Sequence, residues 1–237
     1  IWEDDLEHDA TVISFTELAA GYQSAEIVLG ASSHRRYRTG EKIPDTAREH
    51  PSGFWFDSYN TALGIDSTGV NGIYHKSMLV VGVERIPYYS FLKRFEFLFV
   101  NLGGMSGQLG TDTERRVLTS PKGYKIGPAI CWEGVYGEFF GGFVKAGADV
   151  MAIISNDGWW GDTQGYKHLF SFSRIRAVEH RRAIARSANT GISGFINQRG
   201  DVLSRTQWDE RLSMSAYVTT NDKLTFYTRY GDYIGRI

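Results

Sequence analysis

Cysteine is almost absent from this chain: Cys131 is the only one in 237 residues. An intramolecular disulfide and a zinc site built from several cysteines are therefore both excluded. A lone cysteine does not identify the redox compartment, because a periplasmic or extracellular domain can also lack disulfides. Proline is scarce as well, with 5 residues against 27 glycines and no low-complexity tract, which favours tight turns over linkers.

The chain also has no excess of either charge. It carries 26 Lys and Arg against 27 Asp and Glu, a formal net charge of −1. A strongly basic nucleic-acid binder and an acidic disordered chain are both excluded. Hydrophobic residues make up 42% and aromatic residues 14% of the sequence, enough for a sizeable core. We expect a single domain over 1–237, since single α/β domains often reach ~200–250 residues.

Long apolar runs are missing too, and none approaches the ~18–20 residues of a membrane helix. Residues 1–5 are too acidic for a signal peptide. The first residue is not Met, the chain opens in mid-pattern, and it stops without a tail. We therefore expect an excised piece of a longer protein.

Hydrophobic periodicity predicts an alternation of strands and helices, which is typical of an α/β fold with partly antiparallel sheets. Helices are predicted over 9–22, 136–146 and 166–182, and strands over 26–31, 54–65, 72–78, 124–131, 149–155, 183–188 and 191–197. The polar segment 32–52 reads as a surface excursion. The pair Asn71-Gly72 predicts a turn before the strand at 72–78.

Two predicted helices have an apolar stripe at helical spacing, which should face the core. In the first helix, with Asp9 as its cap, the stripe includes Val12, Phe15, Leu18, Ala19 and Tyr22. In the helix over 166–182 it consists of Leu169, Phe172, Ile175 and Val178.

The surroundings of Cys131 suggest more than a packing role. A lone cysteine at a strand end is usually a small buried hydrophobe. Here a predicted strand ends at Cys131, Trp132 and Glu133 follow, and Gly134 precedes a helix. A sharp strand-to-helix turn exposes a nucleophile, and the next backbone N–H, that of Trp132, can stabilise an oxyanion.

A reactive thiolate also needs a positive neighbour, because an ordinary thiol titrates near ~8.5 and is mostly protonated at neutral pH. Lys76 is a candidate, since it lies near the end of a predicted strand where the sequence turns apolar. Taken alone, a lysine at a strand end is more often a solvated surface residue.

These residues belong to an ordered set of motifs. The set resembles the carbon–nitrogen hydrolase (nitrilase) superfamily, and the likeness is strongest to the periplasmic catalytic domain of the apolipoprotein N-acyltransferases. The resemblance covers roughly residues 70–205. The motifs are Tyr74-His75-Lys76, Glu84, Ile130-Cys131-Trp132-Glu133, Asn156-Asp157-Gly158-Trp159-Trp160, His168 with the arginine-rich 174–182, and 186–193.

The resemblance implies a four-layer α-β-β-α sandwich and a Glu–Lys–Cys triad. Cys131 would be the nucleophile, Lys76 its electrostatic partner, and Glu84 a second catalytic glutamate. The pocket residues that it implies are Trp132, Glu133, Asn156 and Trp159. The chain departs from the pattern at Trp132, where the acyltransferases more often have Tyr, and at Trp160, where Phe is more usual.

One element of the family pattern has no match. Its general base is a glutamate in a Pro-Glu-Thr-like motif at the end of the first strand. None of the five prolines here is followed by glutamate. We expect that the chain begins after this first strand, and that residues 1–237 alone are nearly inactive.

Segment 86–109 is unusually aromatic: six of the fourteen residues over 86–99 are Phe or Tyr. It could be an ordinary core helix, or a dimer-interface arm as in soluble nitrilases. It could equally be a lid that faces the membrane, because aromatic amphipathic segments partition into the bilayer interface.

By resemblance, the chain would transfer an acyl group from a phospholipid, through a Cys131 thioester, to the N-terminal amine of a diacylglyceryl lipoprotein. It would act at the periplasmic face of the bacterial inner membrane, held by flanking membrane helices. The alternatives are a soluble amidase or nitrilase for a small C–N bond, and a non-catalytic remnant that binds lipid or a partner. No nucleic acid, metal or organic cofactor is implied.

Overall fold

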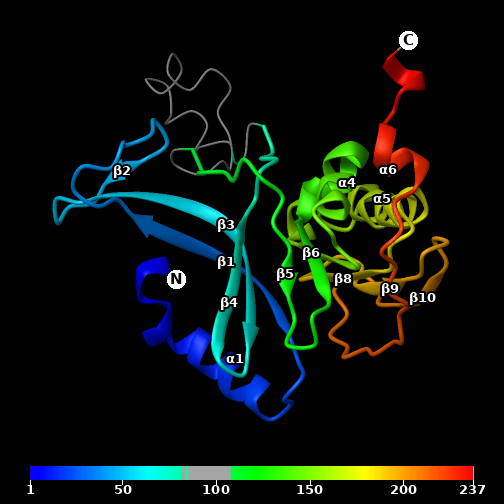
Figure 1. Cartoon of the computed structure of the whole chain (residues 1–237), viewed down its shortest axis with the longest axis horizontal. Helices are drawn as coiled ribbons and strands as arrows, with labels where there is room; N and C mark the ends of the chain where they lie inside the picture. Colours follow the sequence, from blue (N-terminus) through cyan, green and yellow to red (C-terminus); the bar gives the residue numbers. More distant parts are fainter. Residues whose placement is uncertain (82–83, 85–107, 237) are drawn as a thin grey trace.

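Two β-sheets pack face to face, and helices cover the outer face of each (Figure 1). The computed structural model describes residues 1–81, 84 and 108–236. Helix α1 (Ala10–Ala20) lies against β3 and β4 of the first sheet, whereas α4 and α5 lie against the second sheet. The predicted four-layer α-β-β-α arrangement is confirmed.

The first sheet is antiparallel and is built around its long strand β3, which pairs with the three others. Its strands are β1 (Ile27–Arg36), β2 (Arg48–Glu49), β3 (Trp55–Asp66) and β4 (Gly69–His75). Strand β4 ends at His75, so Lys76 is the first residue after this strand.

The second sheet has the strand order β10-β9-β8-β7-β6-β5. Strands β6, β7 and β8 run parallel, so their carboxyl ends lie along one edge of the sheet. The six strands are β5 (Leu118–Thr119), β6 (Lys125–Ile130), β7 (Val150–Ser155), β8 (Ile184–Ala188), β9 (Gly194–Ile196) and β10 (Val202–Arg205).

The first helix begins at a recognisable capping residue. The Asp9 side chain accepts hydrogen bonds from the Thr11 and Val12 amides and so caps α1. The longer helices of the second half are α4 (Gly137–Lys145) and α5 (Gln164–His180), and the shorter ones are α6 (Phe226–Tyr230), η1 (Glu3–His8), η3 (Cys131–Val135), η4 (Asp157–Trp160) and η5 (Ile234–Arg236). The core fills the space between the sheets and beneath α4 and α5.

The interpretation of 32–52 as a surface excursion is wrong at both of its ends. Strand β1 continues to Arg36 and pairs with β3 along its whole length, from Ile27 opposite Ile65 to Arg36 opposite Phe56. Residues 48–49 form β2, also against β3. The polar residues up to Arg36 form a strand because their backbone pairs with β3. Among them, Ser33 is fully buried.

The turn predicted at Asn71-Gly72 is also wrong. Strands β3 and β4 are joined by Ser67 and Thr68, and Gly69 follows at a φ of 120°. The Asp66 carboxylate accepts a hydrogen bond from the Thr68 amide. This bond stabilises the turn at Ser67 and Thr68, ahead of the Asn-Gly pair. Asn71 lies inside β4, where its side chain donates to Asp66 and to a glutamate before β1.

Both predicted helix stripes were only partly correct. Leu18 is 53% exposed, because the inner face of α1 is formed by smaller residues. In α5, Ile175 and Val178 are exposed, whereas Arg176 and His180 are buried. Arg176 can face inward because its guanidinium donates to the Val135 carbonyl and to the Glu179 carboxylate, and the His180 ring is hydrogen-bonded to Thr228 of α6.

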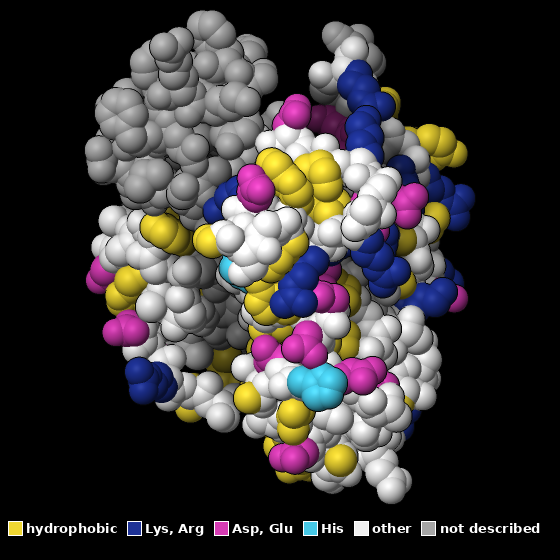
Figure 2. All heavy atoms as spheres, turned by 90° about the vertical axis from the view of Figure 1, so that its left-hand side faces the viewer, with side chains coloured by type: hydrophobic (Ala, Val, Ile, Leu, Met, Phe, Trp, Pro, Cys, Tyr) yellow, Lys and Arg dark blue, Asp and Glu magenta, His cyan; other side chains and the backbone are white. Residues whose placement is uncertain are grey.

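The predicted membrane-facing arm over 86–109 lies outside the described residues up to residue 107. Of its last two residues, Leu109 is buried. Within the part of the chain that the structure describes, no helix has the length and apolar character needed to cross a bilayer. Acidic, basic and apolar side chains are interspersed on the face drawn in Figure 2.

Candidate active site

Cys131 occupies a sharp turn at the carboxyl end of β6. The strand ends at Ile130, and η3 begins at Cys131 itself. The φ angle of Cys131 is 52°, in the left-handed region that a non-glycine residue adopts at a cost of roughly 1–2 kcal/mol. Such strain persists only where the surrounding structure enforces it, and it is concentrated at functional sites. The side chain is half-buried and free of any disulfide.

A fully buried carboxylate, Glu133, holds this turn against the first sheet. Glu133 accepts a hydrogen bond from the Ile130 amide at 2.8 Å and from the Tyr74 hydroxyl at 2.7 Å. It also accepts from the amides of Ser77 and Met78, at 2.7 and 3.2 Å. Burial raises the pKa of Glu133, although each of these hydrogen bonds lowers it. One carboxylate thus ties the residues around Cys131 to the segment that directly follows Lys76.

Lys76 is buried with its charge paired. Its side chain is 1% exposed, and its Nζ lies 2.7 Å from both carboxylate oxygens of Glu84. Glu84 also accepts from the Asn60 side chain at 2.7 Å and from the Val80 amide at 2.8 Å. The Lys76 amide in turn donates to the Asn60 carbonyl at 2.8 Å. The reading of Lys76 as solvated surface is therefore excluded.

Two indole rings stand beside the turn at Cys131. Trp132 and Trp160 stack with centroids 6.1 Å apart and planes at 22°. The Trp132 Nε1–H donates to the Tyr136 hydroxyl at 2.9 Å, which fixes the orientation of the ring. Trp159, by contrast, is 67% exposed. The aromatic neighbour of Trp132 is thus Trp160, the last residue of η4, which follows the adjacent parallel strand β7.

The segment after β7 is held by a buried ion pair. Asp157 and the Arg186 side chain are 0% and 1% exposed, and Arg186 Nη2 lies 2.7 Å from Asp157 Oδ2. The other Asp157 oxygen accepts from the Ser155 hydroxyl at 2.5 Å. A Cβ on Gly191 would collide with the Asp157 carboxylate, so the close approach requires glycine there. This pair fixes the start of η4, which carries the stacked Trp160.

Asn156 lies at the exposed rim of the same edge. Its Oδ1 accepts from the Gly158 amide at 3.2 Å and from the Asn189 side chain at 2.7 Å. Asn189 follows β8, so the side chains after β6, β7 and β8 form one continuous rim. Glu133 connects the turn after β6 to Ser77 and Met78, which directly follow Lys76.

The predicted roles of Cys131, Lys76 and Glu84, and of the pocket residues, stay predictions. Asn60 and Tyr136 are contacts that sequence reasoning missed, because an asparagine within a strand and a tyrosine before a helix carry no distinctive motif. Among the described residues, no group of three or more His, Cys, Asp or Glu side chains is arranged to hold a metal ion.

The profile of the family described as carbon-nitrogen hydrolase matches residues 6–220. An apolipoprotein N-acyltransferase of Chlorobaculum tepidum is 31% identical over 202 residues, covering 82% of this chain and 38% of that protein. One from Thermotoga maritima is 28% identical over 198 residues, covering 83% of this chain and again 38% of the relative. The chain therefore spans well under half the length of these relatives.

Solved structures of the nitrilase superfamily share the fold. The C. elegans NitFhit protein aligns with a TM-score of 0.55 and 21% identity, covering 84% of this chain and 43% of that one. Nit3 of Saccharomyces cerevisiae, described as a member of branch 10 of the nitrilase superfamily, aligns with a TM-score of 0.53 and 16% identity, covering 86% and 63%.

Proposed function

Because this chain belongs to the carbon-nitrogen hydrolase family, we propose that it is the catalytic domain of an apolipoprotein N-acyltransferase. Membership supports an acyltransferase or hydrolase, and the curated relatives named above support acyl transfer within that class. The acyl donor would be a phospholipid, and the acceptor the N-terminal amine of a diacylglyceryl lipoprotein. The site would face the periplasm, at the surface of the inner membrane.

The observation that carries the proposal is the strained backbone of Cys131 at the β6–η3 turn. A positive φ at a strand-to-helix junction presents a nucleophile at the edge of a sheet. The neighbouring Trp132 amide would stabilise the oxyanion that forms beside it. A cysteine that served only for packing would gain nothing from such a conformation.

The reaction would take place in two steps through a covalent intermediate. In the first, the Cys131 thiolate attacks the ester carbonyl of a phospholipid; a C–S bond forms, the ester C–O bond breaks, and the leaving alkoxide takes up the proton that the thiol lost on ionisation, so that the lysophospholipid departs as an alcohol. In the second, the lipoprotein amine attacks the thioester; a C–N bond forms, the C–S bond breaks, and the amine proton is released as the thiol is regenerated.

Lys76 would stabilise the negative charge on the thiolate and then on the tetrahedral oxyanion. Its burial makes this interaction stronger than it would be in water. Glu84 would hold the ammonium in place through its contacts at 2.7 Å. The Trp132–Trp160 stack and Asn156 would line the approach to Cys131.

The test is an acyl-transfer assay on the full product of the gene. The protein is reconstituted in vesicles of phospholipid labelled in the acyl chains, and a diacylglyceryl-cysteine peptide is added. We expect the label on the peptide amine as a hydroxylamine-resistant amide. Without peptide, we expect a hydroxylamine-sensitive thioester on Cys131. Cys131→Ala should abolish both products.

Two outcomes would contradict the proposal. Hydrolysis of small amides or nitriles without transfer to the peptide would identify the chain as an amidase or nitrilase. The absence of any Cys131-dependent reaction would favour a non-catalytic domain that binds lipid or a partner.

Residues 1–237 alone should lack turnover. The Pro-Glu-Thr-like motif of the general base has no match in these residues. Positioned general-base catalysis typically contributes ~10²–10⁴-fold. We expect Cys131 in residues 1–237 to react with iodoacetamide but to give no measurable phospholipid or amide turnover. Sustained turnover by residues 1–237 would show that this glutamate is dispensable.

A further inference from the structure

His75, the last residue of β4 and the neighbour of Lys76, lies half-buried between two carboxylates. The His75 side chain is 14% exposed. Nε2 lies 2.8 Å from Glu3 Oε1, and Nδ1 lies 3.5 Å from Asp112 Oδ1. Glu3 belongs to η1 and Asp112 to the segment before β5. One imidazole ring therefore joins three stretches of chain that are distant in sequence.

The geometry requires both ring nitrogens to face carboxylates, which only a doubly protonated imidazole satisfies fully. The Tyr59 ring stacks on His75 with centroids 4.0 Å apart and planes at 19°. The His75 amide donates to Asp112 Oδ2 at 3.1 Å, and the Ser33 hydroxyl donates to Glu3 at 2.5 Å. Ring, backbone and both carboxylates are thus fixed together.

The titratable and charged groups around this ring come from every element that packs against it. They are Glu3 from η1, Tyr59 from β3, Asp112 with Arg116 at 3.8 Å from the segment before β5, and Arg35 from β1, whose charge acts on Glu3. Burial lowers the pKa of His75, but the hydrogen bonds and charges of Asp112 and Glu3 together raise it to about 9.

We propose that His75, as an imidazolium held by Glu3 and Asp112, is a positioning residue that fixes Lys76 for its action on Cys131. The inference rests on the proposed function, since it takes Lys76 as the electrostatic partner of the thiol. His75 contacts no reacting atom in this scheme. It acts through the backbone and through the balance of charge behind Lys76.

The mechanical link passes through the end of β4. The His75 amide is bound by Asp112, and the next amide, that of Lys76, donates to the Asn60 carbonyl. The Asn60 side chain holds Glu84, which in turn holds Lys76 Nζ. Asn60 directly follows Tyr59, the residue that stacks on His75. Displacing the ring would loosen both supports of the lysine.

The electrostatic link is the neutralisation of Glu3 and Asp112. Both carboxylates are largely buried, at 10% and 15% side-chain exposure, and the pKa of each is lowered. Without the imidazolium, two buried negative charges would face the strand end that carries Lys76. They would compete with the thiolate for the ammonium and would draw the strand end out of register.

The test is the alkylation rate of Cys131 by iodoacetamide in wild type and His75→Gln, measured from pH 6.5 to 10. At pH 7 we expect the variant to react about 5- to 20-fold more slowly. At pH 10, where wild-type His75 is also neutral, we expect the two rates to converge. A purely structural loss would instead lower the rate by the same factor at every pH.

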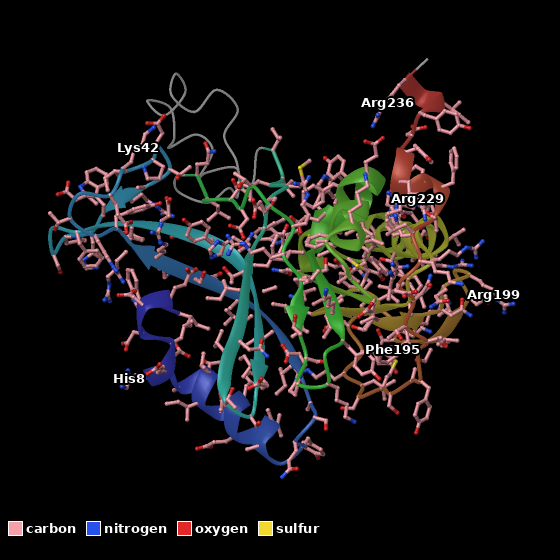
Figure 3. All side chains as sticks on the ribbon, in the orientation of Figure 1. His8, Lys42, Phe195, Arg199, Arg229 and Arg236 are labelled. Carbon is pink, nitrogen blue, oxygen red and sulfur yellow. The ribbon has the colours of Figure 1, made fainter. Side chains whose placement is uncertain are left out.

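Three further variants complete the design. His75→Lys keeps a cation between the carboxylates, so it should restore the rate at pH 7 and retain it at pH 10. Asp112→Asn leaves one carboxylate and should give an intermediate loss, which keeps the test informative if His75→Gln does not fold. The matched control is His8→Gln: His8 pairs with Asp5 at 2.8 Å but is 80% exposed, beside α1 (Figure 3), and should react like wild type.

Lys76→Met separates this inference from the proposed function. If Lys76→Met leaves the alkylation rate unchanged, Lys76 is not the electrostatic partner of the Cys131 thiolate. That part of the proposed function is then contradicted, and this inference fails with it. If Lys76→Met slows the reaction while His75→Gln has no effect, or a loss that does not depend on pH, the positioning role alone is overturned.

Discussion

Two histidines, one half-buried in the first sheet and one fully buried at the end of α5, show how differently the same side chain can be accommodated. His75 lies on the first sheet between Glu3 and Asp112, and its pKa is raised to about 9. His180, at the end of α5, is fully buried, and its pKa is lowered to about 4, chiefly by burial. Carboxylates that face both ring nitrogens keep the charge on His75, whereas burial without such hydrogen bonds disfavours it on His180.

The hydrogen-bond partners of His180 are neutral, although the Glu179 carboxylate lies 3.8 Å from Nε2. Its Nε2–H donates to the Gly137 carbonyl at 3.0 Å, and Nδ1 accepts from the Thr228 hydroxyl at 2.8 Å. Phe140 stacks on the ring at a centroid distance of 5.7 Å. Nearby arginines further disfavour the cation. His180 therefore joins α4, α5 and α6 by packing and neutral hydrogen bonds, whereas His75 joins its segments by charge.

The largest contrast should be in chemistry. Lys76→Met should lower the rate of Cys131 acylation by about 10²–10³-fold, because it removes a preorganised positive charge from the oxyanion. The matched control is Lys145→Met on α4, an exposed lysine near His180, which should leave the rate unchanged. Equal effects of both changes on thioester formation, followed by intact mass, would contradict the assignment of chemistry to the first region.

The second contrast is in stability. His180→Ala should lower the free energy of unfolding by about 3 kcal/mol, since it leaves a cavity and two buried unpaired polar groups. Urea unfolding would measure this, with His8→Ala expected within about 0.5 kcal/mol of wild type. The alkylation rate of Cys131 in the folded fraction should not change. A matching fall in that rate would mean that the two regions are coupled.

The third contrast is in pH dependence, and the signs are opposite. The folded-state pKa of His75, about 9, lies above the ordinary ~6.5, so its stabilisation is complete below pH ~6.5 and is lost as pH rises through 9. The folded-state pKa of His180, about 4, lies below it, so its contribution is complete above pH ~6.5 and is lost as pH falls through 4.

Each loss should reach about 3 kcal/mol at most. The measurement is the free energy of unfolding of wild type minus that of His75→Gln or His180→Asn, from pH 4 to 9.5. The His75 difference should shrink toward alkaline pH, and the His180 difference toward acid pH. Two differences that shrink in the same direction would refute the contrast.

The smallest effect concerns one carboxylate of the His75 pair. Glu3→Gln removes one of two charges, so the pKa of His75 should fall by about one unit, still above that of His180. Titration of the histidine Cε1–H resonances by NMR would follow both rings. Asp5→Asn, which removes the carboxylate facing exposed His8, should leave the pKa of His75 unchanged. No fall after Glu3→Gln would show that Asp112 alone holds the charge.

Local patterns predicted much of the second sheet and its helices. Apolar runs marked β6, β7 and β8 of the second sheet, and on the first sheet the capping residue Asp9 marked the start of α1. These elements depend on interactions within a few residues or on continuous burial, which a sequence displays directly. The turn at Asn71-Gly72 failed because an Asp66 side chain in the neighbouring turn formed the competing bonds.

The sequence predicted the central residues of the candidate site but not the residues that support them. The motifs around Cys131, Lys76 and Glu84 marked residues whose chemistry is distinctive. The supports of these residues, Asn60 and the His75 pair of carboxylates, have no local signature. They act only because chains far apart in sequence meet at the end of β4.

The sequence by itself determined the α/β class, the family and the position of a sharp turn at Cys131, because these depend on local patterns of residue type. Tertiary structure alone decided which ionisable groups keep their charge. His75 and His180 each have charged neighbours along the chain, yet the ring of one faces carboxylates at both nitrogens and the ring of the other is hydrogen-bonded to a carbonyl and a hydroxyl. Solvation and charge at a buried group depend on its neighbours in space, and those are fixed only when the two sheets and their helices pack.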